Sequence, residues 1–171
     1  MKIQDILQYN RQLVIDRWFK AMIDNYPKDA GKFLIEKHKQ FSNPIGFAIA
    51  ENLPPVYDSI ANPEKFEIPK QALENIIKIH AVQNISASEA ISFIFKLKDI
   101  LRESNIKQVV DNKFYVEYLK IESNIDRVTM AAFDIYMQNR ELLYEIKANE
   151  VRNRTHKIVE RLNKKYGYEG E

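Results

Sequence analysis

The sequence contains no cysteine and only three histidines, which are His38, His80 and His156. The absence of cysteine excludes disulfides, thiolate metal ligands, iron–sulfur clusters and cysteine nucleophiles. The histidines are too scattered in sequence to show the spacing of a zinc site. Glycine-rich phosphate loops, internal repeats and low-complexity tracts are absent as well. The sequence therefore indicates neither a metal site nor a phosphate-binding loop.

Long apolar runs and a charge excess are also missing. No apolar run approaches the roughly 20 residues that a membrane span needs. The amino terminus, MKIQDILQYN, lacks the apolar core of a signal peptide. We therefore expect a cytoplasmic protein. The 26 basic and 24 acidic residues nearly balance, so we expect no nucleic acid as partner.

The richest supply of apolar side chains lies between Ala72 and Arg102 and predicts two buried helices joined by a tight corner. The second helix begins at Ser86, which can cap the amide of Glu89 while Glu89 reaches back to the Ser86 amide. Its polar side chains form one narrow stripe, so most of its surface needs cover. We expect this helix, over 86–102, at the centre of the domain. The polar stripe is Ser92, Lys96, Asp99 and Glu103.

Shorter helices are predicted around this pair. Trp18 is expected to anchor a first helix, and two successive prolines, Pro54 and Pro55, are expected to kink or break a third one. The third helix begins with Asn43 as its cap and Pro44 as its first residue. The predicted segments are helices over 3–25, 28–39 and from 44 onward, a loop over 62–69, and a polar connection over 103–112.

The longest periodic segment follows Phe114, where apolar side chains recur in steps of four and three as in a coiled coil. Beyond Leu143 the stripe shifts to a new set of positions, so we expect this helix to leave the domain and present a new face. That second stripe predicts self-association as a homodimer. Basic residues concentrate between Arg140 and Lys165. The shifted positions are Tyr144, Ala148, Val151, Thr155, Ile158 and Leu162.

Together these patterns predict an all-α, single-domain bundle of about six helices with a long carboxy-terminal helix. We assign residues 1–147 to the helical domain and 148–171 to a basic extension of the last helix. The chain is long enough to bury a core without disulfides.

Four residues of the long helix are candidates for a ligand or partner site: Asp134, Tyr136, Arg140 and Tyr144. A partly buried pair of Asp134 and Arg140 among aromatic side chains could fix the helix position or line a small pocket. A plain surface ion pair is the other interpretation. Glu122 and Asp126, four residues apart, could perform acid and base work, but no second catalytic group accompanies them. We therefore expect no enzymatic activity.

Several short motifs together resemble one known family, the amino-terminal input domain of the RsbRD type of RsbT co-antagonist proteins. These motifs span roughly residues 10 to 145. They are Trp18 with Tyr26-Pro27, Asn43-Pro44-Ile45-Gly46, Ala81-Val82-Gln83 with Ser86 to Ala90, and Ala132 to Tyr136 with Arg140-Glu141.

The resemblance implies a sensory or regulatory role, since such domains precede output modules in stress-signalling, stressosome-like proteins and in some sensor kinases. Free-standing copies resemble proteins encoded beside respiratory sulfur-metabolism complexes, which implies peripheral association with a membrane respiratory complex. The chain ends at Glu171 without an output module. We therefore expect binding of a protein partner as its output, and the small-molecule ligand remains undetermined.

A second resemblance concerns the fold. The order of Trp18, Phe41, a helix ending near His80 and a new helix soon afterwards is similar to that of a globin. This layout would place His80 where a haem-ligating histidine sits, yet the related RsbR input domains resemble globins that have lost haem. We expect a buried His80 satisfied by a nearby carbonyl, and no cofactor. A globin-like sensor of haem or a small ligand is the alternative function.

Overall fold

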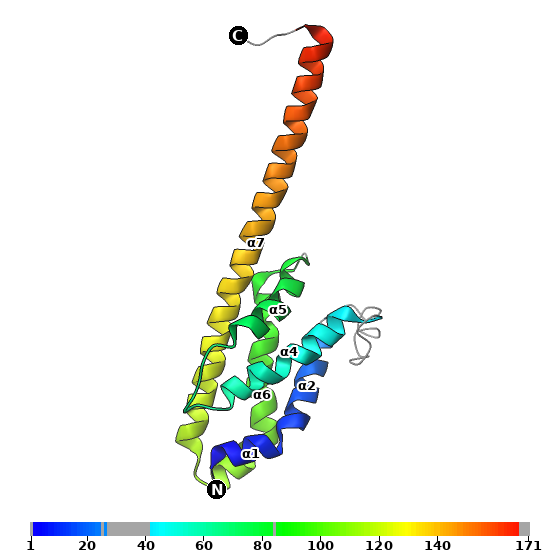
Figure 1. The fold of residues 1–171 in the computed structure, drawn as a ribbon. Helices are drawn as coiled ribbons and strands as arrows, with labels where there is room; N and C mark the ends of the chain where they lie inside the picture. Colours follow the sequence, from blue (N-terminus) through cyan, green and yellow to red (C-terminus); the bar gives the residue numbers. More distant parts are fainter. Residues whose placement is uncertain (1, 25, 27–41, 84, 168–171) are drawn as a thin grey trace.

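The computed structural model describes residues 2–24, 26, 42–83 and 85–167. Within these ranges the chain forms six α-helices and no strand, which confirms the predicted all-α bundle (Figure 1). The helices are α1 (Ile3–Tyr9), α2 (Arg11–Ile23), α4 (Pro44–Ile60), α5 (Lys70–Ala81), α6 (Ala87–Asp111) and α7 (Tyr115–Tyr166).

Helix α6 is the centre of the bundle, as predicted, because it packs against α1, α2, α5 and α7. Its start is fixed by a reciprocal cap. The Glu89 amide donates to Ser86 Oγ at 3.3 Å, and the Ser86 amide donates to Glu89 Oε2 at 2.9 Å. Ile94 and Leu97 are fully buried on this helix, whereas Phe95, also predicted to be covered, is 48% exposed.

Trp18 anchors α2 to α6, as the sequence predicts. Its side chain is fully buried, and its indole Nε1 donates to the Phe93 carbonyl at 2.7 Å. The rings of Trp18 and Phe93 stack with centroids 5.9 Å apart. A buried indole therefore has both its apolar surface and its one donor satisfied.

The single helix predicted over 3–25 is wrong, because the chain breaks between α1 and α2 at Asn10. Asn10 has φ −91° and ψ 2°, and its side-chain amide donates to Asn105 Oδ1 of α6 at 2.7 Å. Asn105 is itself buried and donates to the Leu101 carbonyl at 3.1 Å. The bond to Asn105 therefore fastens the turn between α1 and α2 to α6.

The polar connection predicted over 103–112 is also wrong, since α6 continues to Asp111. Asn105 and Val109 are buried along this stretch, and α1 packs against the same helix. Tertiary contacts therefore extend a helix through a sequence that is mostly polar.

Pro54 and Pro55 do not break α4, which runs from Pro44 to Ile60 without interruption. Pro55 and Glu51, whose carbonyl loses its helical donor at Pro55, belong to the exposed side of the helix. The predicted start is confirmed, because Asn43 Oδ1 accepts from the Gly46 amide at 2.9 Å. The loop predicted over 62–69 is also confirmed.

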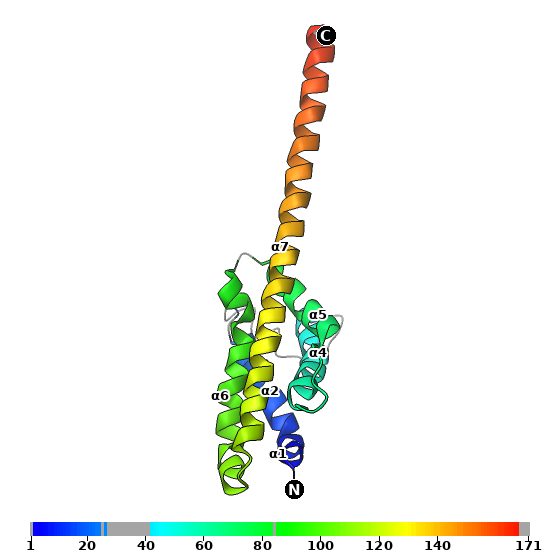
Figure 2. The ribbon, with the colours of Figure 1, turned by 90° about the vertical axis from the view of Figure 1, so that its left-hand side faces the viewer.

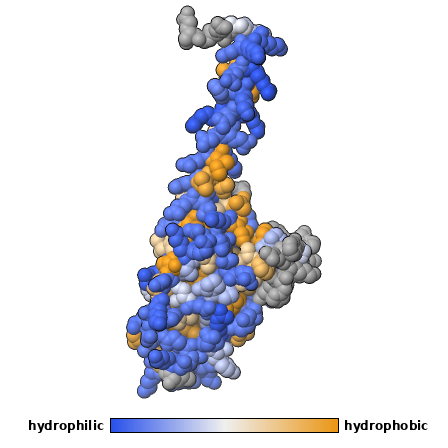
Figure 3. Space-filling view, in the orientation of Figure 1, coloured by the Kyte–Doolittle hydropathy of each residue, from blue (hydrophilic) through white to orange (hydrophobic). Residues whose placement is uncertain are grey.

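Helix α7 contains 52 residues and is roughly 80 Å long at 1.5 Å per residue. Its first half packs against α4, α5 and α6, and its second half projects from the body of the domain (Figures 1 and 2). Every residue from Tyr144 to Tyr166 is exposed. This confirms the prediction that the helix leaves the domain. The surface of the projecting part is mainly hydrophilic with apolar patches (Figure 3).

The helix predicted over 28–39 and Phe41 of the globin-like order lie outside the described residues. Among the described helices, none is long and apolar enough to cross a membrane.

Candidate functional site: a clamped corner beside a small cavity

The candidate site lies where the chain turns from α5 into α6. We call this turn the α5–α6 corner and define it by Ala81, Gln83 and Ile85, whose backbone carbonyls bond to α7. Because α5 ends at Ala81, its last carbonyls lack partners within the helix. The corner therefore presents acceptors that another element has to satisfy.

Two side chains of α7, Tyr136 and Arg140, supply the donors, and together with Tyr144, which accepts from Arg140, they form what we call the corner clamp. Tyr136 Oη donates to the Ile85 carbonyl at 2.7 Å. Arg140 Nη1 donates to the Ala81 carbonyl at 3.2 Å and to the Gln83 carbonyl at 3.4 Å. Its second terminal nitrogen donates to Tyr144 Oη at 2.8 Å.

The clamp is favourable for electrostatic as well as geometric reasons. The Arg140 guanidinium lies at the carboxy-terminal end of α5, where a positive charge interacts well with the helix dipole. Its carbon Cζ is 5.1 Å from the centroid of the Tyr144 ring. Tyr136, Arg140 and Tyr144 are four residues apart in turn, so one face of α7 carries the whole clamp.

Asp134 does not belong to this group. It is exposed, and no ion pair between Asp134 and Arg140 occurs in the described part of the chain. On a helix, positions 134 and 140 point in directions about 120° apart, which keeps the two side chains on different faces. The predicted Asp134–Arg140 pair is therefore wrong, and Arg140 bonds to backbone carbonyls instead.

A cavity of about 220 Å³ lies beside the corner. Its lining combines apolar side chains with several groups that can form hydrogen bonds. The lining residues are Met22, Tyr26, His80, Gln83, Ile85, Glu89 and Ser92. An opening of this composition can hold a small polar molecule.

Gln83 connects the cavity with the clamp. Its side-chain amide lies 3.5 Å from Tyr26 Oη in the cavity wall, and its carbonyl accepts from Arg140. Ile85 lines the cavity and accepts from Tyr136. A change in the cavity wall can therefore reach α7 through two residues of the corner.

His80 is buried, with 5% of its surface exposed. Its Nδ1 is 2.8 Å from the Ala90 carbonyl, so Nδ1 carries the proton and donates. The Phe93 ring meets the imidazole edge-on with centroids 5.8 Å apart. Burial lowers the pKa of His80 below its ordinary value, and the bond to Ala90 offsets this only in part.

A haem does not fit the cavity beside His80. Its volume of about 220 Å³ is below the roughly 300 Å³ at which sites for drug-sized ligands begin, and a haem is larger than most such ligands. No cluster of three or more potential metal ligands occurs among the residues that the structure describes.

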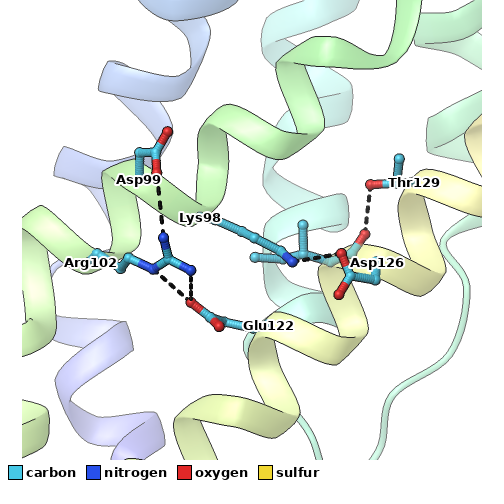
Figure 4. Close-up of polar contacts among 7 residues, drawn as sticks. Lys98, Asp99, Arg102, Glu122, Asp126 and Thr129 are labelled. Carbon is cyan, nitrogen blue, oxygen red and sulfur yellow. Dashed lines mark hydrogen bonds and ion pairs between the residues drawn. The ribbon is translucent and has the colours of Figure 1, made fainter. Parts of the chain in front are cut away.

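Glu122 and Asp126 each contact a cation of α6 rather than each other (Figure 4). Lys98 Nζ lies 2.6 Å from Asp126 Oδ1, and the Arg102 guanidinium lies 2.8 Å from Glu122 Oε1. Neighbouring Thr129 donates to the Ile125 carbonyl at 2.8 Å. These ion pairs join α6 to α7.

Sequence reasoning found the clamp side chains but missed Gln83, Ile85 and Tyr26 as members of the site. Backbone carbonyls carry no signal in the sequence, so the acceptors could not be predicted. The available signal was the spacing of Tyr136, Arg140 and Tyr144, which places three polar side chains on one helical face.

The fold and the corner define an all-α module in which one helix joins a packed body to an exposed extension. The family model of the RsbT co-antagonist protein rsbRD N-terminal domain matches residues 13–151. The chain belongs to this family and is a signalling-related helical module. Comparisons with curated proteins and with solved structures found no match, so the resemblance to globins is not confirmed.

Proposed function

We propose that this protein is a non-enzymatic regulatory module that acts by binding a protein partner through the projecting part of α7. One observation carries the proposal. From Tyr144 to Tyr166 every side chain is exposed, including Val151, Ile158 and Leu162, which are 65%, 50% and 49% exposed. In proteins most of the stability of a helix comes from packing of its apolar face, so an apolar stripe without cover on this helix supports binding of a second surface.

The clamped corner supplies a route for regulation. Among the described residues it is the last place along α7 that contacts the body by hydrogen bonds, through Arg140 to the Ala81 and Gln83 carbonyls. A signal that displaces Gln83 or Ile85 therefore changes how the base of the projecting helix is held. Through this corner, binding of a ligand in the cavity could change how strongly the projecting helix binds its partner.

The proposal is tested by affinity capture from the native cell. The double variant Val151→Asp, Ile158→Asp places charge in the exposed apolar stripe, whereas Asn153→Asp adds a charge on another exposed face of the same helix. We expect a partner that the wild type and Asn153→Asp retain and the double variant loses. Capture of the same proteins by all three would overturn the proposal.

A small-ligand sensor is the second candidate, and the cavity beside His80 favours it. Such a ligand would serve as the signal of the regulatory module. If the ligand were haem, the purified protein would show a strong absorption band near 400 nm, and His80→Ala would abolish it. We expect colourless protein instead, because the cavity is small.

The family resemblance supports a place in stress or respiratory signalling, including peripheral association with a membrane respiratory complex, and these roles remain proposals. The cytoplasmic location and the assignment of 1–147 and 148–171 as separate regions also remain predictions.

A further inference from the structure

The exposed stripe of the projecting helix has the heptad spacing of a coiled-coil seam. Its positions alternate in steps of four and three, which gives a repeat of 3.5 residues. We define the seam as Tyr144, Ala148, Val151, Thr155, Ile158 and Leu162. The spacing fits a second helix that lies along α7 with knobs-into-holes packing.

One edge of the seam is uniformly basic. Lys147, Arg154 and Arg161 are seven residues apart and all exposed, so they form a line of cations beside the apolar positions. Each of them directly precedes a seam residue, namely Ala148, Thr155 and Leu162. In a coiled coil, charged residues at this flanking position select the partner helix. Arg154 also pairs with Glu150 at 3.1 Å, but both are well exposed, and such pairs contribute little.

The other edge supplies no matching row of carboxylates. It holds Glu145, Arg152, Val159 and Tyr166. In a parallel pair of identical helices, each flanking residue meets the position five residues later in the second copy. Lys147 would meet Arg152, and Arg154 would meet Val159. In an antiparallel pair the cation lines would face each other.

The net charge of the whole segment also disfavours a pair of identical helices. From Tyr144 to Tyr166 the helix carries seven basic and three acidic residues, although the entire chain has a net charge of only +2. Two copies placed side by side therefore repel along the seam, and a partner of opposite charge is attracted.

We infer that the seam binds an amphipathic helix of another protein whose flanking positions carry carboxylates. This inference rests on the proposed function and specifies the chemistry of the partner. The apolar positions supply the area that is buried, and the line of Lys147, Arg154 and Arg161 selects the acidic helix.

The test uses the full chain and two synthetic four-heptad peptides, both with Ile and Leu at the seam positions. One peptide carries Glu at every flanking position and the other carries Lys. Fluorescence anisotropy at low salt is expected to show binding of the Glu peptide at least about tenfold tighter than that of the Lys peptide. The difference shrinks as salt screens the charges.

A charge-reversed chain supplies the matched control. In Lys147→Glu, Arg154→Glu, Arg161→Glu the preference is expected to invert toward the Lys peptide, and circular dichroism checks that the helix persists. Equal binding of both peptides to the wild type, or failure of the Glu peptide to bind, would overturn the inference. Unchanged preference in the charge-reversed chain would do the same.

Two other occupants are tested in parallel. Sedimentation of a stable dimer at low salt that excludes the Glu peptide would identify a second copy as the occupant. Binding to phosphatidylserine vesicles that exceeds binding of the Glu peptide, and that the charge reversal abolishes, would identify an anionic membrane. Either result overturns the inference.

The native-cell capture separates failure of this inference from failure of the proposed function. If capture depends on Val151 and Ile158 but not on the cation line, the partner is not selected by charge and only this inference fails. If capture is insensitive to Val151 and Ile158, the proposed function itself fails.

Discussion

At the scale of single residues, His80 illustrates how burial fixes a protonation state. Its Nδ1 donates to the Ala90 carbonyl, and its ring is enclosed by Phe93 and Tyr26. Burial disfavours the imidazolium, which lowers the pKa of His80. The folded protein therefore binds a proton at this site less readily than the unfolded chain does.

This difference predicts a stability that depends on pH. The unfolded histidine has a pKa of about 6.5, so the contribution of His80 is fully present above that pH and is lost as the pH falls below it. The slope reaches at most about 1.4 kcal/mol per pH unit for one proton. Denaturant melts between pH 8 and pH 5 should show the free energy of unfolding falling with a slope no steeper than that of one proton.

The matched controls are two substitutions. His80→Asn should remove this part of the slope, whereas His156→Asn should leave it, because the His156 side chain is 72% exposed. An unchanged slope in His80→Asn would show that the protonation of His80 is not linked to folding.

Residue-level features were predictable from the sequence where they are local. Ser86 and Glu89 are three residues apart, and the cap that this spacing predicts is present. Arg140 was predicted to pair with Asp134 but binds carbonyls at Ala81 and Gln83, far away in sequence. A backbone acceptor has no side-chain identity, so the sequence cannot indicate it.

At the scale of elements, α6 determines the stability of the body. Ile94 is fully buried on this helix, and its replacement by Ala leaves a cavity that should cost about 2 to 4 kcal/mol. Phe95→Ala is the control, since Phe95 is 48% exposed, and should cost less than about 1 kcal/mol. Denaturant unfolding measures both, and similar small losses would show that α6 is peripheral.

The corner clamp makes a separate prediction for α7. Tyr136→Phe removes the donor to the Ile85 carbonyl and should cost about 1 to 2 kcal/mol, because a partly buried acceptor loses its partner. Leu142→Ala, at a position 56% exposed on the same helix, should cost far less. Equal losses in the two variants would mean that the clamp does not hold α7.

Element boundaries were harder to predict than element types. The periodic segments of α5, α6 and α7 were recognisable because their buried faces repeat at helical spacing. The break at Asn10 and the continuation of α6 past Glu103 were not, because both depend on Asn10 meeting Asn105 across the bundle. Contacts between distant segments override local propensity at these positions.

At the scale of the whole molecule, the packed body and the projecting part of α7 have different surfaces. The body buries most of its large apolar side chains in one core, whereas the apolar side chains of the projecting part are all exposed and form a seam with a basic edge. The homodimer is a prediction, and the row of Lys147, Arg154 and Arg161 disfavours it at low salt.

Self-association through the seam should increase with salt, because screening weakens the repulsion between the two cation lines. Sedimentation at tens of micromolar, in low and high salt, measures the dimer fraction, in the range of a modest interface with Kd on the order of 10 µM. A dimer that dissociates as salt rises would indicate attractive charge contacts and contradict this account of the seam.

The most direct measurement of the central claim is site-specific photo-crosslinking in the native cell. A photoreactive amino acid at position 158 lies in the seam, and one at position 153 lies on another exposed face of the same helix. The account predicts a discrete crosslinked partner at position 158 and none at position 153. Equal crosslinking at both positions, or none at position 158, would contradict the claim that α7 projects in order to bind a partner.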